Sequence, residues 1–290
     1  ALPDDAVVRV RVAPPLPGLG LLELIPADGL AARADPDDLD GDGVSGRLGA
    51  AVDLLSGRPA VGRFGWYADQ PSVEQQTATA VVLDMGLTSR YFPTPSCDRW
   101  APCLREGIPV SEQYDPAYGD PTAGIDYPDE GEVSDRRLYD LTVYTQALAV
   151  PGPRELGDPE VERGWELFSS TGCATCHAGP YTTGVGPMEG LSNQRIQPYT
   201  DLLLHDLGDG LADRTVAGAV VPTEWRTPPL WGVGLLETVS GHTDLLHDGR
   251  ARGVEEAVLW HDGEAAGSAA AYRSLSAADR AALVRFVESL

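Results

Sequence analysis

The stretch Cys173-Ala174-Thr175-Cys176-His177 decides how the rest of this sequence is interpreted. It is a C-x-x-C-H pattern, in which two thiols add across the two vinyl groups of a haem and the histidine turns its imidazole onto the iron. A thioredoxin-like redox pair would need a βαβ context, and half of a zinc site would need a further Cys or His pair nearby. Neither context surrounds residue 173. The stretch therefore predicts one covalently attached haem c, with His177 as its proximal ligand.

The segments on either side of this motif are typical of helices. Asp158-Pro159 is an N-cap followed by proline at the first helical position, and it opens a helix that leads into the motif. Ser276, with Asp279 three residues later, resembles a capping box and starts a closing helix. A helix before the haem motif and a helix at the end of the domain resemble the layout of cytochrome c folds.

A second pair of cysteines, Cys97 and Cys103, lies in a loop rich in proline and tryptophan. Haem attachment of this type occurs in an oxidising compartment, where a disulfide between these two residues is the expected state. A buried pair of free thiols is the alternative. The same reasoning predicts a periplasmic or otherwise exported protein.

Composition limits the classes of function. The chain has 290 residues and carries 44 acidic against 21 basic side chains, all of the latter arginine, for a net charge of −23. This acidity would repel phosphate backbones, which excludes nucleic acid as a partner, and no run of about 18 apolar residues exists to span a membrane. The charge would attract a basic redox partner such as a small cytochrome, or serve solubility alone. The 33 Gly and 24 Pro predict a loop-rich fold with short helices.

An internal repeat sets the domain organisation. Arg11-Val-Ala-Pro-Pro-Leu-Pro-Gly-Leu-Gly-Leu-Leu-Glu23 matches Arg226-Thr-Pro-Pro-Leu-Trp-Gly-Val-Gly-Leu-Leu-Glu237, with one extra residue in the first copy. His177 lies 49 residues before Arg226, so the same offset from Arg11 places a first haem motif about 40 residues upstream of Ala1. We therefore expect a second haem in a longer parent chain.

The fold class that follows is mainly α and loop-rich, with tandem cytochrome c-like domains of which the first is incomplete at its N-terminus. Residues 1–150 would be the remainder of the first haem domain, with an acidic loop and the disulfide loop. Residues 151–290 would form the C-terminal haem domain.

The acidic loop is the second strong chemical signal. Asp38, Asp40 and Asp42 alternate as in a D-x-D-x-D-G calcium loop, with Gly43 turning the chain and Val44 offering a backbone carbonyl. Hard oxygen donors at this density suit Ca²⁺, whereas unpaired they would repel one another. A solvated acidic turn is the alternative, because the twelfth position of a full EF-hand loop is glycine here.

Together these stretches resemble the bacterial di-haem oxidoreductases that are classed as peroxidase-like. This family is distantly related to the di-haem cytochrome c peroxidases and to the di-haem enzyme that matures methylamine dehydrogenase. The resemblance covers nearly the whole chain and rests on residues 11–26, 35–47, 62–66, 84–89, 198–205, 224–231 and 246–250. It implies oxidoreductase chemistry on haem, and its relatives hold calcium near the haem interface.

The resemblance also proposes the second axial ligand. In the peroxidase relatives a His-Asp-Gly element is followed by a short helix that brings in a methionine ligand. Here the element is His247-Asp248-Gly249, and His261 occupies the ligand position. A bis-histidine haem, His177 and His261, is therefore the first choice. His205 is the second choice, with a hydrogen-bonded structural role as its alternative.

Further roles follow from the same resemblance. Trp66 aligns with a tryptophan between the two haems, Asp84 with an acidic residue that assists O–O cleavage, and Gln76 with the same pocket. These are the candidate catalytic residues. Arg226 and Arg250 would pair with haem propionates, because a guanidinium binds a carboxylate bidentately; ordinary salt bridges are the alternative.

Three functions remain open on the sequence. The first is an oxidoreductase enzyme that passes electrons to or from a partner protein or peroxide. The second is a non-catalytic electron-transfer cytochrome, since imidazole on both faces of the iron blocks access to it. The third is a haem domain that serves only as a binding scaffold.

Overall fold

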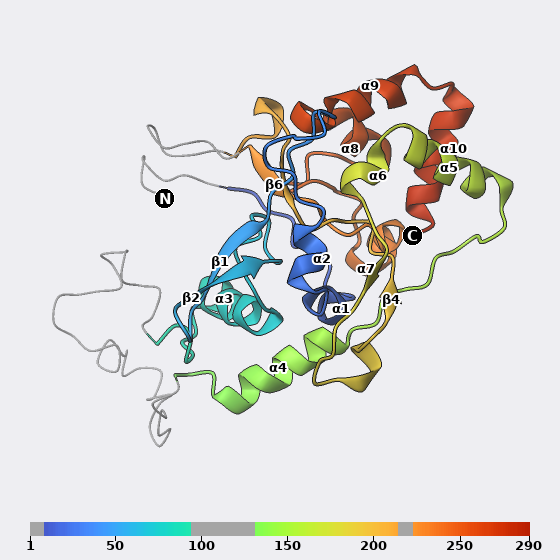
Figure 1. Ribbon diagram of the computed structural model, residues 1–290. Coiled ribbons are helices and arrows are strands. Elements are labelled where there is room, and N and C mark those ends of the chain that lie inside the picture. The colour runs from blue at the N-terminus through green and yellow to red at the C-terminus, as the bar shows by residue number, and fades with distance from the viewer. Residues whose placement is uncertain (1–8, 94–130, 214–222) are drawn as a thin grey trace, which may run out of the picture.

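The protein is described from a computed structural model that covers residues 9–93, 131–213 and 223–290 (Figure 1). Helices predominate in these ranges and the strands are short. The α-helices are α1 Leu19–Glu23, α2 Ala27–Ala31, α3 Val73–Met85, α4 Asp135–Ala147, α5 Pro159–Ser170, α6 Cys173–Cys176, α7 Leu236–Ser240, α8 Val254–Trp260, α9 Ala266–Ser274 and α10 Ala277–Glu288. The 3₁₀ turns are η4 Glu189–Leu191, η5 Asp209–Leu211, η6 Val233–Leu235 and η7 Gly263–Ala265.

The strands pair two by two into antiparallel ladders. They are β1 Gly49–Asp53 with β2 Arg58–Gly62, β3 Tyr181–Thr182 with β4 Arg195–Ile196, and β5 Leu204–Asp206 with β6 Glu224–Arg226. In the last ladder His205 lies opposite Trp225. The prediction of a mainly helical, loop-rich fold is therefore confirmed.

The C-terminal part is built on two crossing helices, α5 and α10, which lie side by side in Figure 1. Asp158 caps α5 by accepting a hydrogen bond from the Glu160 amide, and Ser276 caps α10 through the Asp279 amide, as the sequence predicts. Gly164 allows the close approach, because a Cβ there would lie 2.1 Å from the Ala282 carbonyl oxygen. Aromatic and aliphatic side chains from α5, α8, α9 and α10 fill the core between them.

The N-terminal part consists of the β1–β2 hairpin with α3 and α4 packed together beside it (Figure 1). Ser72 caps α3 and Ser134 caps α4, each by accepting a hydrogen bond from an amide in the first turn. A small core from both helices, centred on Val81 and Leu138, is buried there.

A shared core joins the two parts. Leu22, Ile25 and Phe64 pack in one cluster with Leu202 and Trp231. This cluster crosses residue 150, so the apolar interior is continuous between residues 1–150 and 151–290. The division into tandem domains stays a prediction.

The two copies of the repeat adopt the same local structure. Gly18 and Gly232 each adopt a left-handed conformation, with φ of 81° and 77°, at the start of a short helical segment. The Gly18 amide donates to the carbonyl of Leu148, just after α4, and the Gly232 amide donates to that of Leu290, just after α10. The matching sequences therefore make matching contacts, each with a helix of its own half.

Candidate haem site

An apolar cavity of about 210 Å³ lies between α5, α8, α9 and α10 and extends to the N-terminal part of the chain. Its walls carry Cys173 and His177 from the attachment motif and His261 from the end of α8. The N-terminal part contributes residues 12–15 and Trp66. The cavity thus brings together one of the two predicted attachment cysteines, Cys173, and both predicted axial ligands.

Helix α6 presents the attachment motif. Gly172 starts this single turn in a left-handed conformation, and the His177 amide closes it by donating to the Cys173 carbonyl. Cys173 and Cys176 are free thiols, and burial raises the pKa of each. Two neutral thiols one helical turn apart are the groups that vinyl addition requires.

The ring of His177 is oriented by a backbone carbonyl. Its Nδ1–H donates to the Tyr199 carbonyl oxygen at 3.0 Å, which leaves Nε2 to act as a ligand. Tyr199 itself has a φ of 53°, an unusual conformation for a residue other than glycine. Phe168 packs against the ring, with 6.3 Å between the centroids.

His261 is oriented in the same way at the end of α8. Its Nδ1–H donates to the Ala257 carbonyl oxygen at 2.7 Å, so Nε2 is again left to act as a ligand. Burial lowers the pKa of His261, and burial together with the charge of His261 lowers the pKa of His177 to about 4. Both rings are therefore neutral at pH 7, the form in which imidazole binds a metal.

Arg226 lies on the cavity wall, whereas Arg250 is engaged elsewhere. The Arg226 side chain donates to the carbonyls of Gly65 and Thr227, forms no ion pair within the described ranges, and burial lowers its pKa to about 10. Arg250 donates to Oδ1 of Asp248 at 3.0 Å and to Oδ2 at 2.7 Å, and it is not one of the residues that line the cavity. Of the two predicted propionate partners, Arg226 alone faces the space in which a propionate would lie.

Trp66 belongs to an aromatic group on the cavity wall. Its indole N–H donates to the Val12 carbonyl, and its ring makes edge contacts with Trp225 and His247. Trp225 and His247 are stacked, with their ring centroids 3.7 Å apart. Tyr67 is also stacked on Trp225. The structure thus brings Trp66 to the cavity that holds the histidines, and His247 serves as a packing residue there.

The other predicted residues lie apart from this cavity. Asp84 is exposed near the end of α3, and Gln76 lies on the same helix, with a buried side-chain oxygen that has no hydrogen-bond partner among the described residues. Neither lines the cavity. Cys97 and Cys103, with their predicted disulfide, fall outside the described residues.

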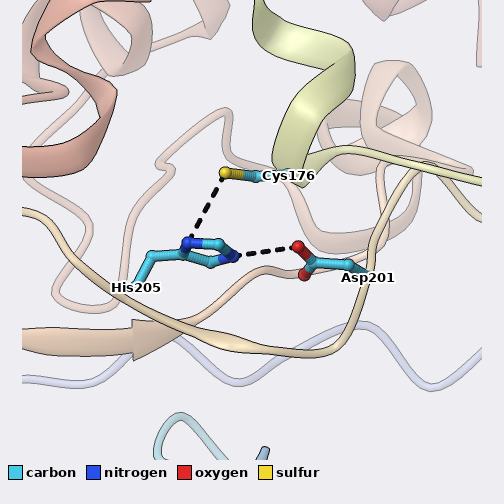
Figure 2. A group of neighbouring side chains, drawn as sticks. All are labelled: Cys176, Asp201 and His205. Carbon is cyan, nitrogen blue, oxygen red and sulfur yellow. Dashed lines mark hydrogen bonds and ion pairs between the residues drawn. The ribbon is translucent and has the colours of Figure 1, made fainter. Parts of the chain in front are cut away.

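His205, the second choice as an iron ligand, has both nitrogens engaged. Nε2 lies 2.9 Å from the Asp201 carboxylate and Nδ1 lies 2.8 Å from the Glu264 carboxylate, and Figure 2 shows the ring between Asp201 and the Cys176 sulfur. These hydrogen bonds raise the pKa of His205 to about 12 despite its burial. The ring is therefore a buried imidazolium, and the alternative role as a hydrogen-bonded residue fits it better than iron ligation.

This network was missed by sequence reasoning, because Asp201 and Glu264 are far apart in the chain. The one signal for it was the pattern of Asp201 and His205 on either side of three leucines. Charged groups in a buried segment require partners, but the sequence does not tell which ones.

The acidic loop differs in detail from the prediction. Carboxylate oxygens of Asp35, Asp38 and Asp40 lie within 4.8 Å of one another. The Asp42 carboxylate instead accepts a hydrogen bond from the Val44 amide at 2.8 Å. The group of possible ligands is therefore Asp35, Asp38 and Asp40, where the sequence predicts Asp38, Asp40, Asp42 and Val44.

A helical fold around an apolar cavity, lined by Cys173 of the C-x-x-C-H motif and by two neutral histidines, His177 and His261, is consistent with a haem protein. The chain belongs to the family described as "Di-haem oxidoreductase, putative peroxidase", which it matches over residues 1–290. No curated protein matches it.

Among solved structures, hydrazine synthase of Kuenenia stuttgartiensis is similar at 19% identity and a TM-score of 0.39. The match covers 56% of this chain and 57% of that chain. Within the described ranges, no helix combines the length and the apolarity needed to cross a membrane.

Proposed function

We propose that this chain is the haem-bearing part of an exported c-type haem oxidoreductase, which passes electrons to or from a partner protein or peroxide. Cys173 and Cys176 would attach the haem, and His177 and His261 would bind its iron. The observation that carries the proposal is the pair of neutral imidazoles, each with Nδ1 held by a carbonyl and Nε2 left for a metal in one cavity. A bound haem would supply one-electron chemistry at the iron.

The chain's own residues define how such a haem would be held. The apolar walls exclude water, and Arg226 offers an unpaired guanidinium for a propionate. Trp66 and Trp225 provide aromatic rings between the cavity and the N-terminal part. An expected second haem in the parent chain would lie on that side, and Asp84 and Gln76 remain candidates for peroxide chemistry there.

A non-catalytic electron-transfer cytochrome is the second candidate, and one observation favours it. Histidine on both faces leaves no position at the iron for a substrate unless one ligand departs. In this chain alone, electron transfer would then be the activity. The redox partner would carry positive charge, such as a small basic cytochrome, to complement the net charge of −23.

Calcium on the acidic loop completes the proposal. Oxygen donors of Asp35, Asp38 and Asp40 are the ligand type that Ca²⁺ prefers. The ion would offset part of the repulsion in this loop. Calorimetric titration with calcium tests it, and the absence of binding would remove the ion from the proposal.

Optical and EPR spectra of the holoprotein, with and without peroxide, test the main proposal. We expect a low-spin haem in the wild type and a high-spin or five-coordinate haem in His261→Ala, whose sixth ligand is removed. An unchanged low-spin spectrum in this variant would rule out His261. Two peroxide-inert low-spin haems in the parent protein would favour electron transfer over peroxidase activity.

A further inference from the structure

The buried network around His205 connects the two segments that carry the proposed axial ligands. On one side, the Asp201 amide donates to the Cys176 carbonyl at 2.9 Å, next to His177. On the other side, Glu264 lies three residues after His261, in the turn that follows it. His205 reaches both carboxylates and is 3% exposed.

Every polar group of this network has a partner. Asp201 also accepts a hydrogen bond from the Leu203 amide, and Glu264 accepts from the amide and hydroxyl of Ser45 at 3.0 and 2.8 Å. The hydrogen bonds from His205, from Ser45 and from the Asp206 amide outweigh burial and lower the pKa of Glu264 to about 2. Because carboxylates only accept hydrogen bonds, the geometry requires a proton on both nitrogens of His205.

The surrounding backbone leaves the ring no room to move. A Cβ at Gly46 would lie 2.6 Å from Cε1 of His205, so glycine is needed there. Leu202, between Asp201 and His205, has a φ of 60°. This conformation is unfavourable for a leucine, so the surrounding contacts must hold it.

A metal site at the same place is disfavoured by the same geometry. Ligand atoms of Cys176, Asp201 and His205 lie within 4.8 Å of one another. However, an imidazole that donates from both nitrogens has no lone pair for a metal. The sulfur of Cys176 is also the atom that haem attachment uses.

We propose that His205 is a positioning residue. Its ring, held between Asp201 and Glu264, links the segment of Cys176 and His177 to the turn after His261. This link would hold the imidazoles of His177 and His261 where they can bind the haem iron. The inference rests on the proposed function, because it assumes the His177/His261 pair. Without the network, the turn of residues 262–265 loses its bonds to β5 and to Ser45, and His261 is free to leave the iron.

The test uses the holoprotein and four variants: His205→Ala, Glu264→Ala, Glu264→Gln and His247→Ala. The readouts are the low-spin fraction in the EPR spectrum and carbon monoxide binding to the ferrous protein. We expect the two network alanine variants to lose most of the low-spin signal and to bind carbon monoxide, which the wild type excludes. Glu264→Gln keeps the length of the side chain and one oxygen that can accept from His205 and the Ser45 amide, but its NH2 group cannot accept from the Asp206 amide. It should therefore keep a larger low-spin fraction and bind less carbon monoxide than Glu264→Ala.

His247→Ala is the matched control, since it also removes a buried histidine from the cavity wall without touching Glu264. It should remain closed to carbon monoxide. Should His205→Ala fail to fold, the pair Glu264→Ala and Glu264→Gln decides the question, because both variants leave His205 in place and differ only in the group that meets it.

The outcomes separate this inference from the function on which it rests. A wild type that already binds carbon monoxide would overturn both. A closed wild type with equally closed His205→Ala and Glu264→Ala variants would overturn the role of the network alone. Opening of His247→Ala to the same extent would also overturn it, since any loss of packing would then suffice.

Discussion

The two copies of the repeat share their backbone contacts and differ in what their arginines face. Arg11 opens the first copy and pairs with Asp213 at 2.6 Å, while its guanidinium also lies over the Trp225 ring. Arg226 opens the second copy, is 4% exposed, and donates only to carbonyls on the cavity wall within the described ranges. The same residue in the same motif is thus charge-paired in one copy and unpaired in the other.

This difference indicates which copy of the repeat has an arginine available to bind an anion. A buried guanidinium without a carboxylate partner is unfavourable unless a ligand supplies the negative charge. Within residues 1–290 the second copy alone also carries a C-x-x-C-H motif upstream of its arginine. A haem propionate is the anion that would satisfy Arg226, whereas Asp213 already satisfies Arg11.

The largest expected effect tests whether the second copy alone attaches haem. In the double variant Cys173→Ala, Cys176→Ala we expect complete loss of covalently bound haem, because no thioether can form. Haem staining of the denatured protein on a gel measures this. Cys97→Ser removes a thiol outside the motif and should keep its haem; equal loss in both would contradict the assignment.

The next effect concerns the matching glycines. A Cβ at Gly234 would lie 1.8 Å from the Glu288 carbonyl oxygen, and one at Gly20 would lie 2.4 Å from that of Gln146. Substitution by alanine should lower the free energy of unfolding by about 3 kcal/mol at Gly234 and about 2 kcal/mol at Gly20. Denaturant unfolding measures both.

Gly29→Ala is the control for this pair, because Gly29 lies inside α2 with nothing within 4 Å of an added Cβ. It should be neutral or stabilise the protein by up to about 1 kcal/mol. If Gly20→Ala and Gly234→Ala behaved like Gly29→Ala, the close contacts of the repeat with α4 and α10 would be wrong.

A smaller effect separates the two arginines by their influence on the haem. Removal of a buried positive charge disfavours the reduced, less positive iron. Arg226→Gln should therefore lower the midpoint potential, with a change in the free energy of reduction on the order of 1 kcal/mol. Arg11 is 28% exposed, so water screens the loss of its charge, and Arg11→Gln should lower the potential less than Arg226→Gln. Spectroelectrochemical titration of both variants checks this, and equal shifts would remove the distinction.

The smallest effect is a difference in pH dependence. Hydrogen bonds from Tyr67 and Arg11 outweigh burial and lower the pKa of Asp213 below its ordinary value of 3.8. The stability that the pair contributes is therefore present above pH 3.8 and is lost as the pH falls through the folded-state pKa. Arg11→Gln should cost up to about 1 kcal/mol near neutral pH and progressively less below pH 3.8.

Arg226 forms no ion pair among the described residues, and only the more distant charge of Asp201 raises its pKa against burial. The cost of Arg226→Gln should therefore fade less in acid than that of Arg11→Gln. Parallel unfolding curves of both variants between pH 3 and 7 make the comparison. An acid-sensitive cost at Arg226 would show that a carboxylate pairs with it after all.

Much of the site follows from local sequence patterns. The C-x-x-C-H spacing places Cys173 and His177 on one helical turn. The capping residues Asp158 and Ser276 predict where α5 and α10 begin. The histidine that follows the short helix α8 also reaches the cavity, as the resemblance implies. These predictions succeed because each depends on residues close together in the chain.

What the spacing of residue types could not determine was which partner each charged side chain takes. Arg226 and Arg250 look equivalent in the sequence, yet Arg250 pairs with Asp248 while Arg226 is buried and donates to carbonyls. Likewise, the carboxylate of Asp35, and not that of Asp42, lies with those of Asp38 and Asp40. Competition between local partners decides such cases, and the spacing of residue types does not describe it.

The sequence by itself determined the haem motif, the duplication and the mainly helical fold, since spacing and capping are local properties. Only the tertiary structure decided that His261 and His177 share one cavity, and that His205 is held between Asp201 and Glu264. The physical reason is that the role of a buried polar side chain depends on the partners that folding places beside it. These partners determine whether it binds a metal, forms an ion pair or positions another residue.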